Sequence, residues 1–362
     1  MKHSKIFSFI MLAALIAFTS CVKDLDTSPI DEDNTTSEDL FSTPEGYTQG
    51  LAKLYAGLSL TGQEGPAGDG DIVGVDEGFS SYLRNYWKAQ ELTTDEAVNG
   101  WGDEGLGDFH IHSWTSSNPF VRGMYYRIYF QLPLANEFIR ESADSKLDDR
   151  GISGETKATI QIYRAEARFL RALSYFHALD LFGNVPFVTE DDPIGAYLPE
   201  QIQRADLFEY IESELLDIEE KLIAPMQNDY PRADRAAAWA LLAKLYLNAE
   251  VYAGEDRYTD CITYCNKIIE AGYSLHPEYD ELFMADNHQC QGTIFSIAFD
   301  GTTSQTWGGT TFLVCAAIGG SMSPSEFGVE GGWGGNRTTS ALVEKFGDIS
   351  SGSLVTDRKS VV

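Results

Sequence analysis

The sequence predicts a mainly α protein, a tetratricopeptide-like helical superhelix with long loop-rich insertions and a few short strands. Three observations predict it. Long stretches repeat apolar residues at helical spacing, a short helix-packing motif recurs along the chain, and two Gly-rich stretches interrupt the helices. With 43% apolar residues among 362, the chain can bury a large core.

The clearest helix is expected over residues 155–182. From Arg164 to Phe182 it contains neither Gly nor Pro, and Gly183 suits the left-handed position after a helix. Pro186 then prevents the helix from resuming. Its apolar stripe comprises Ala165, Phe169, Ala172, Phe176 and Leu179.

Arginines occupy a second face of this helix, at Arg164, Arg168 and Arg171. The chain has 55 Asp and Glu residues against 26 Lys and Arg. We therefore expect these arginines to pair with acidic side chains, the alternative being that they bind an anion.

Further helices are expected to begin near residue 44 and to cover 121–141, 204–223, 232–252 and 257–271. The run Trp239-x-x-Leu242-Ala243-x-x-Tyr246 matches the first helix of a tetratricopeptide repeat, in which a small residue lets helices approach closely. The latter half of this motif recurs as Leu51-Ala52-x-x-Tyr55, Leu134-Ala135-x-x-Phe138 and Arg171-Ala172-x-x-Tyr175.

Cys261 and Cys265 are four residues apart, so they share one face of a helix. Tyr258, Ile262 and Ile269 fall on the same side, which predicts a buried face with core thiols rather than a metal pair. Neither a disulfide framework, nor a metal site, nor a cofactor is predicted for this chain.

The N-terminal residues have the features of a targeting signal. Lys2 and Lys5 precede a short apolar run that ends in small residues before Cys21, so residues 1–20 are expected to be a lipoprotein signal peptide. The Cys21 thiol would carry lipid (palmitate among the acyl chains), and ordinary secretion is the alternative. Residues 21–41 are expected to form an acidic tether.

The formal net charge of −29 repels phosphates and anionic headgroups. It therefore argues against nucleic acid and against an anionic membrane as binding surfaces. A neutral or cationic ligand suits such a surface.

Two insertions, at about 61–117 and 292–337, break the helical pattern, and short β-like pieces are expected at 293–299 and 310–314. Tryptophans in Gly-rich loops beside Asp and Asn are typical of sugar sites, because a sugar ring stacks on an aromatic plane while polar groups meet its hydroxyls. The candidate ligand-binding residues are Trp101, Asp103, Trp307, Trp333 and Asn336. The alternative is that each Trp covers core beneath a loop, as we expect for Trp87 and Trp114.

The run Arg164-Ala-Glu-Ala-Arg-Phe-Leu-Arg-Ala-Leu-Ser-Tyr-Phe, followed by Leu181-Phe-Gly-Asn-Val-Pro-Phe187, resembles the signature helix of the SusD/RagB family. Cys21-x-x-Asp-Leu-Asp-Thr-x-Pro resembles the start of its mature members. The family comprises outer-membrane nutrient-binding lipoproteins of the starch-utilisation type, built on a repeat superhelix. The resemblance assigns residues 42–362 to one SusD-like domain.

The resemblance implies a lipid-anchored protein on the exterior of the outer membrane. It would bind oligosaccharide without catalysis and deliver it to a TonB-dependent, SusC-like transporter barrel. A peptide-binding member of the family is the first alternative, and a surface glycoside hydrolase or a protein-binding repeat scaffold are others. Family members continue beyond the segment that resembles residues 342–357, so we expect the C-terminal part of the domain to be missing here.

Overall fold

A computed structural model describes residues 36–195 and 198–346. The chain divides into two compact units, residues 1–43 and 44–362. The first contains helix α2 (Ser37–Leu40), whose N-cap Thr36 accepts a hydrogen bond from the Asp39 backbone N–H at 3.1 Å. The predicted signal peptide and the lipidation site Cys21 lie outside the described residues.

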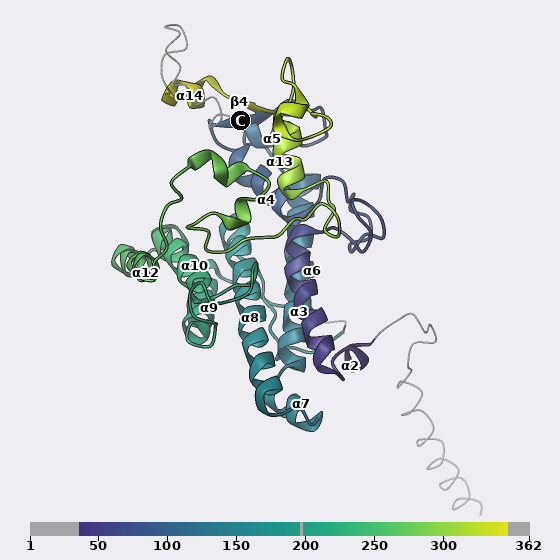
Figure 1. Cartoon of the computed structure of the whole chain (residues 1–362), viewed down its shortest axis with the longest axis vertical. Helices are drawn as coiled ribbons and strands as arrows, with labels where there is room; N and C mark the ends of the chain where they lie inside the picture. The colour runs from purple at the N-terminus through teal and green to yellow at the C-terminus, as the bar shows by residue number, and fades with distance from the viewer. Residues whose placement is uncertain (1–35, 196–197, 347–362) are drawn as a thin grey trace, which may run out of the picture. The chain divides into compact units, whose positions relative to one another are not determined.

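The second unit is built from helices, and the mainly α prediction is confirmed (Figure 1). Its α-helices are α3 (Pro44–Ser59), α4 (Tyr82–Glu91), α5 (Gly107–His110), α6 (Pro119–Glu141), α7 (Asp144–Asp149), α8 (Gly154–Phe182), α9 (Arg204–Ile218), α10 (Arg235–Leu247), α11 (Ala249–Tyr252), α12 (Tyr258–Glu270), α13 (Gly309–Ala317) and α14 (Ser340–Val343). The 3-10 helices are η1 (Tyr279–Phe283), η2 (Asn287–Gln289), η3 (Pro324–Phe327) and η4 (Glu344–Phe346). Within residues 36–195 and 198–346, no helix is both long and apolar enough to cross a bilayer.

Strands are few and short in the described part of the chain. They are β1 (Ala97–Asn99), β2 (Val185–Pro186), β3 (Gln201–Ile202) and β4 (Asn336–Thr338). They form two antiparallel pairs, β1 with β4 and β2 with β3. The first pair joins the two insertions, and the second closes the turn after α8.

Helix α8 is the centre of the packing. It contacts α3, α6 and α9, and Figure 1 shows it running alongside α6. The apolar stripe predicted for it is buried. The helix ends at Phe182 because Gly183 turns the chain with a φ of 72°, which disfavours side chains with a Cβ.

The helix-packing motif lies at helix–helix contacts. In α10, Leu242, Ala243 and Tyr246 are buried, and α10 packs on α9 and α12. The rings of Tyr246 and Tyr264 lie 5.7 Å apart across the α10–α12 contact. The small residue allows the approach and the aromatic ring fills the adjoining groove.

The arginine face of α8 makes ion pairs, as expected from the sequence. Arg168 pairs with Glu214 at 2.7 Å, and Arg171 pairs with the same carboxylate at 2.7 Å and also with Glu190. Arg164 pairs with Asp144 at 3.0 Å. Burial acts to raise the pKa of Glu214, but its hydrogen bonds to Arg168 and the charge of Arg171 outweigh burial and lower it.

The prediction of a buried face around Cys261 and Cys265 is wrong. Cys265 is exposed, and the side chains of Ile262 and Ile269 are 60% and 65% exposed. Helix α12 instead buries Tyr264, on the side that packs against α10. Helical periodicity identifies an apolar face, but it does not show which face has a neighbour.

The strands expected at 293–299 and 310–314 are also wrong. Residues 310–314 belong to α13, in which Phe312, Cys315 and Ala316 are buried at helical spacing. The first stretch has no regular structure. The β-branched residues Thr310, Thr311 and Val314 favour a strand locally, but packing on α4 overrides that preference.

A buried histidine in α8 predicts a dependence of stability on pH. His177 Nδ1 and the Tyr82 hydroxyl form a hydrogen bond at 2.9 Å, and the centroid of the His177 ring lies 4.3 Å from that of the tilted Tyr86 ring. Burial, together with the charge of Lys244, lowers the pKa of His177 to about 3. The ring is therefore neutral in the folded chain, whereas the unfolded chain takes up a proton near pH 6.5.

The contribution of His177 to stability is complete above pH 6.5 and is lost as the pH falls toward 3, at up to about 1.4 kcal/mol per pH unit. Urea unfolding measured from pH 4.5 to 7 should show a shallower decline for His177→Gln than for the wild type. His110→Gln replaces an exposed imidazole and should keep the wild-type decline. Equal slopes for all three proteins would contradict a neutral His177.

Candidate functional site

The pairing of β1 with β4 brings the two Gly-rich, Trp-bearing segments together. Asn99 pairs with Asn336 in an antiparallel register, and the Asn99 side-chain Nδ2 donates to Asn336 Oδ1 at 2.8 Å. The Gly100 backbone N–H donates to the Gly335 carbonyl at 2.8 Å. Trp101 lies two residues after the end of β1 and is therefore held against the segment that precedes β4.

That second segment is anchored on the C-terminal end of α13. The backbone N–H groups of Trp333, Gly334 and Gly335 donate to the carbonyls of Cys315, Ile318 and Ala316 at 2.7, 2.8 and 2.8 Å. The last carbonyls of a helix lack partners within the helix, so this segment satisfies them. As a result, Trp333 is held by main-chain bonds rather than by its own side chain.

The rings of Trp101, Trp307 and Trp333, hereafter the tryptophan cluster, lie side by side. The Trp101 and Trp333 centroids are 6.4 Å apart and those of Trp307 and Trp333 are 6.0 Å apart. Trp101 Nε1 donates to the Trp333 carbonyl at 3.1 Å. Trp101 and Trp333 are half-buried and Trp307 is 41% exposed, so the cluster keeps aromatic surface open to solvent.

Gly335 permits the close approach of Trp101. A Cβ placed on Gly335 would lie 2.3 Å from the Trp101 ring carbon Cε2, closer than atoms can come. The absence of a side chain at this residue therefore lets the indole lie flat against the main chain.

Two buried basic side chains of α4, Arg84 and Lys88, lie near the site, and Arg84 contacts the tryptophan cluster directly. Arg84 donates through Nη1 to the carbonyls of Trp307, at 2.8 Å, and Gly78, and its guanidinium carbon lies 5.6 Å from the Trp101 ring centroid. Burial lowers the pKa of Arg84 to about 10, and the charges of Asp103 and Asp76 offset part of that shift. The hydrogen bond from Arg84 to the Trp307 carbonyl ties the Trp307 segment to α4, next to Trp101.

Lys88 lies one turn further along α4. Its amine is 3.9 Å from the centroid of the Phe120 ring, and its pKa is lowered to about 6, first by burial and then by the charge of Arg84, so the amine is largely neutral at pH 7. Through Phe120, Lys88 lies against the apolar cluster of Leu92, Leu106, Phe109 and Phe120, against which Trp101 also packs.

The two polar residues predicted for the site differ in their surroundings. Asp103 is exposed beside Trp101, so its carboxylate is open to a ligand. Asn336 is half-buried and its Oδ1 accepts from Asn99, so it supports the β1–β4 pair. Among the described residues, no three His, Cys, Asp or Glu side chains gather as a metal site would require.

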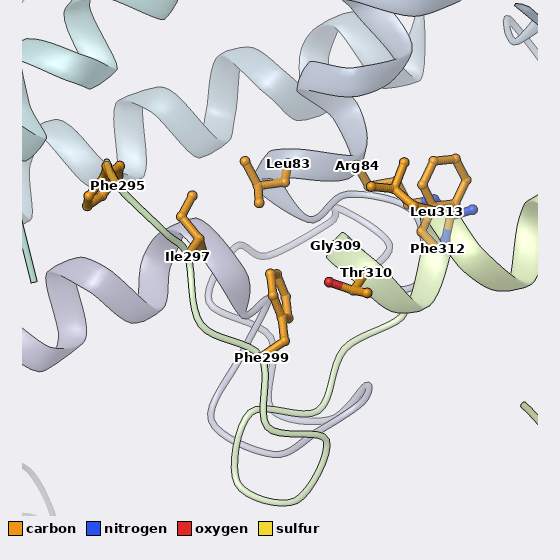
Figure 2. Close-up of a pocket in the computed structure, with 9 residues that line it drawn as sticks. All are labelled: Leu83, Arg84, Phe295, Ile297, Phe299, Gly309, Thr310, Phe312 and Leu313. Atoms are coloured by element: carbon orange, nitrogen blue, oxygen red, sulfur yellow. The ribbon is translucent and has the colours of Figure 1, made fainter. Parts of the chain in front are cut away.

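An apolar cavity of about 240 Å³ lies beside Arg84, between α4, α13 and the segment 295–299. Figure 2 shows Ile297, Phe299 and Leu83 turned toward one another around it. None of the five predicted ligand-binding residues lines this cavity. Its walls are mostly apolar, with Arg84 and Thr310 as the polar residues among them, whereas the tryptophan cluster offers exposed ring faces at the surface.

The sequence reasoning missed Arg84, Lys88 and the helix that carries them. A signal was present, because residues 79–99 contain neither Gly nor Pro. The Trp87 ring packs on the buried Phe312 ring with centroids 5.4 Å apart, in keeping with a structural role. Trp114 packs on the buried Phe109 ring, and its side chain is 43% exposed.

Comparisons with known proteins agree with this architecture. No protein-family model matches the chain. Starch-binding protein SusD of Bacteroides thetaiotaomicron is 36% identical over 349 residues, which cover 94% of this chain and 59% of that protein. The chain thus spans somewhat more than half the length of this relative.

Solved structures share the fold. Surface glycan-binding protein A from Bacteroides fluxus has a TM-score of 0.63 and 21% identity, over 83% of this chain and 60% of that one. Surface glycan-binding protein A from Bacteroides uniformis has a TM-score of 0.63 and 18% identity, over 84% and 62%. The shared helical fold and the identity to SusD along almost the whole sequence show that the chain belongs to the SusD/RagB family.

Proposed function

We propose that this chain binds an oligosaccharide at the tryptophan cluster. The observation that carries the proposal is the convergence of Trp101, Trp307 and Trp333 from segments that are far apart in the sequence. A core needs apolar volume, but it does not need three indoles that each keep an open surface. The relative that shares 36% identity is named as a starch-binding protein, which supports a glycan as the ligand.

The chemistry of the cluster suits a neutral sugar. Ring faces offer apolar area to the C–H side of a pyranose, and the exposed carboxylates of Asp103 and Glu104 can accept hydrogen bonds from hydroxyls at the rim. The chain's net charge of −29 opposes an anionic ligand. Trp101, Asp103, Trp307 and Trp333 are the proposed contacts, and Asn336 holds the strands that position them.

We further propose that the chain works at the exterior of the outer membrane, held by acyl chains on Cys21. From there it would hand its oligosaccharide to a SusC-like, TonB-dependent transporter and carry out no covalent chemistry. The charged and apolar residues before Cys21 and the resemblance of residues 21–29 to mature SusD-like proteins support this placement.

The proposal predicts that Trp333→Ala abolishes retention by starch. Trp333 touches both other indoles, so its loss removes the middle of the cluster, and we expect affinity to fall by about a hundredfold or more, roughly 3 kcal/mol. Retardation of the full chain in native gels that contain soluble starch measures the effect. Tyr279→Ala removes an exposed ring from η1 and serves as the matched control, with wild-type retardation expected.

Equal retardation of the wild type and Trp333→Ala would place binding elsewhere. The same gels, stained for reducing ends, separate binding from hydrolysis, because a hydrolase would generate them. If casein peptides but not starch protect the wild-type chain from thermal unfolding, the ligand is peptide and the proposed function fails.

A further inference from the structure

A second aromatic surface lies outside the tryptophan cluster. It consists of Ile111, His112 and Trp114, hereafter the Trp114 platform. Ile111 is 69% exposed, His112 is exposed and the Trp114 ring is open over nearly half its surface. Exposed residues are continuous from 110 to 117.

The platform is preorganised from below. The Trp114 ring rests on the buried Phe109 ring with centroids 6.0 Å apart, and the His112 ring lies 5.8 Å from it. His112 Nε2 donates to the Thr93 carbonyl at 2.8 Å, and the Ser113 backbone N–H donates to the Asp108 carbonyl at 2.9 Å. These bonds fix the loop, so little conformational entropy remains to be lost on binding.

Its charge pattern selects the class of partner. Residues 109–121 contain no Asp, Glu, Lys or Arg, in a chain with 22% charged residues and a net charge of −29. The side chains beside Trp114 are imidazoles and hydroxyls, and the hydroxyls of Thr115 and Ser117 bond each other at 2.8 Å. Uncharged donors and acceptors around a half-open indole match the hydroxyls and C–H faces of a neutral sugar.

The platform is also continuous with the proposed site. Phe109, which supports Trp114, belongs to the same apolar cluster of buried residues against which Trp101 packs. The same buried cluster therefore lies beneath both surfaces.

We propose that the Trp114 platform is a second contact for neutral polysaccharide, engaged by chains longer than the tryptophan cluster alone can hold. This inference rests on the proposed function, since it takes the same class of ligand. A second weak contact in the same protein raises the apparent affinity for a long chain without changing the affinity for a short one.

The test compares soluble starch with maltoheptaose. For the full chain, Trp114→Ala should weaken apparent affinity for starch by about tenfold and leave the affinity for maltoheptaose within about twofold of the wild type. Ile111 is largely exposed, so Ile111→Ser should leave the fold intact. It should weaken starch binding, as Trp114→Ala does. Tyr279→Ala is again the matched control. Gel retardation measures starch binding and titration calorimetry measures maltoheptaose binding.

Each outcome decides something. Unchanged starch binding by both Trp114→Ala and Ile111→Ser, with Trp333→Ala defective, overturns the second contact and leaves the proposed function standing. An equal loss for starch and maltoheptaose overturns it too, because the platform would then belong to the primary site. Loss of starch binding in Trp114→Ala with Trp333→Ala unaffected would instead overturn the proposed site. A wild type that binds neither glycan overturns both proposals, and the platform would then fit a protein partner.

Discussion

Replacing Arg171 with methionine should lower the free energy of unfolding by about 3–5 kcal/mol, the range for breaking a buried ion pair by removing one partner. The buried guanidinium bonds Asn136 at 2.8 Å, Glu214 at 2.7 Å and Glu190. Without Arg171, the Glu214 carboxylate keeps only Arg168 to offset its burial. Guanidinium chloride unfolding, followed by circular dichroism, measures the loss.

Two further variants test whether the loss comes from the unpaired Glu214 carboxylate. Arg168→Met removes a more exposed partner of Glu214 and should cost clearly less. Adding Glu214→Leu to Arg171→Met should recover part of the loss, because the stranded charge is then gone. A double variant no more stable than Arg171→Met would show that the cost arises from lost packing of the arginine stem and not from the unpaired carboxylate.

The second large effect is expected at Gly335. Alanine there would place Cβ 2.3 Å from Trp101 Cε2, so the indole must move and its bond to the Trp333 carbonyl is broken. We expect a loss of about 1–3 kcal/mol in stability from overpacking. Starch affinity should fall by about tenfold, equivalent to about 1.4 kcal/mol.

Gly331→Ala is the matched control, because its Cβ would meet no atom within 4 Å in the same Gly-rich run. It should keep wild-type stability and wild-type retention by starch. Wild-type binding by Gly335→Ala would show that the position of Trp101 is irrelevant to the ligand.

Local features of the fold could be predicted from the sequence. The end of α8 at Phe182 was predictable because Gly183 and Pro186 terminate the helix. Its start lies one residue before the predicted Glu155, and its apolar stripe is continuous. The partners of Arg164, Arg168 and Arg171 could be named as a class, since acidic residues outnumber basic ones twofold in the chain. Which carboxylates they meet depended on how α8 packs against α9, which carries Glu214, and on where the chain places Asp144 and Glu190.

The incorrect predictions concern segments whose structure depends on contacts with neighbouring helices. Cys265 and Ile262 lie on a regular apolar face, yet α12 packs on α10 through Tyr264. Thr310 to Val314 favours a strand by composition, and contact with α4 makes it a helix. In both cases the local sequence pattern is real, but contacts with a neighbouring helix decide the outcome, and the local sequence does not encode those contacts.

The site was predictable as a set of residues but not as an arrangement. Trp101, Trp307 and Trp333 were chosen for their flanking residues, which carry no information on distance. Their meeting depends on the pairing of Asn99 with Asn336, a long-range contact that no local pattern shows. Arg84 was missed because a helix between two Gly-rich loops was not expected there.

The β1–β4 pair has a consequence for the order in which the molecule becomes competent. Its Asn99–Asn336 side-chain bond closes a loop of 237 residues. Because synthesis proceeds from the N-terminus, Trp101 is made long before β4, and the β1–β4 pair that brings it to Trp333 can form only after residue 338 has been made. A chain that still lacks the β4 segment therefore has no assembled tryptophan cluster, so ring contacts within this cluster report that the chain has been made and folded as far as residue 338.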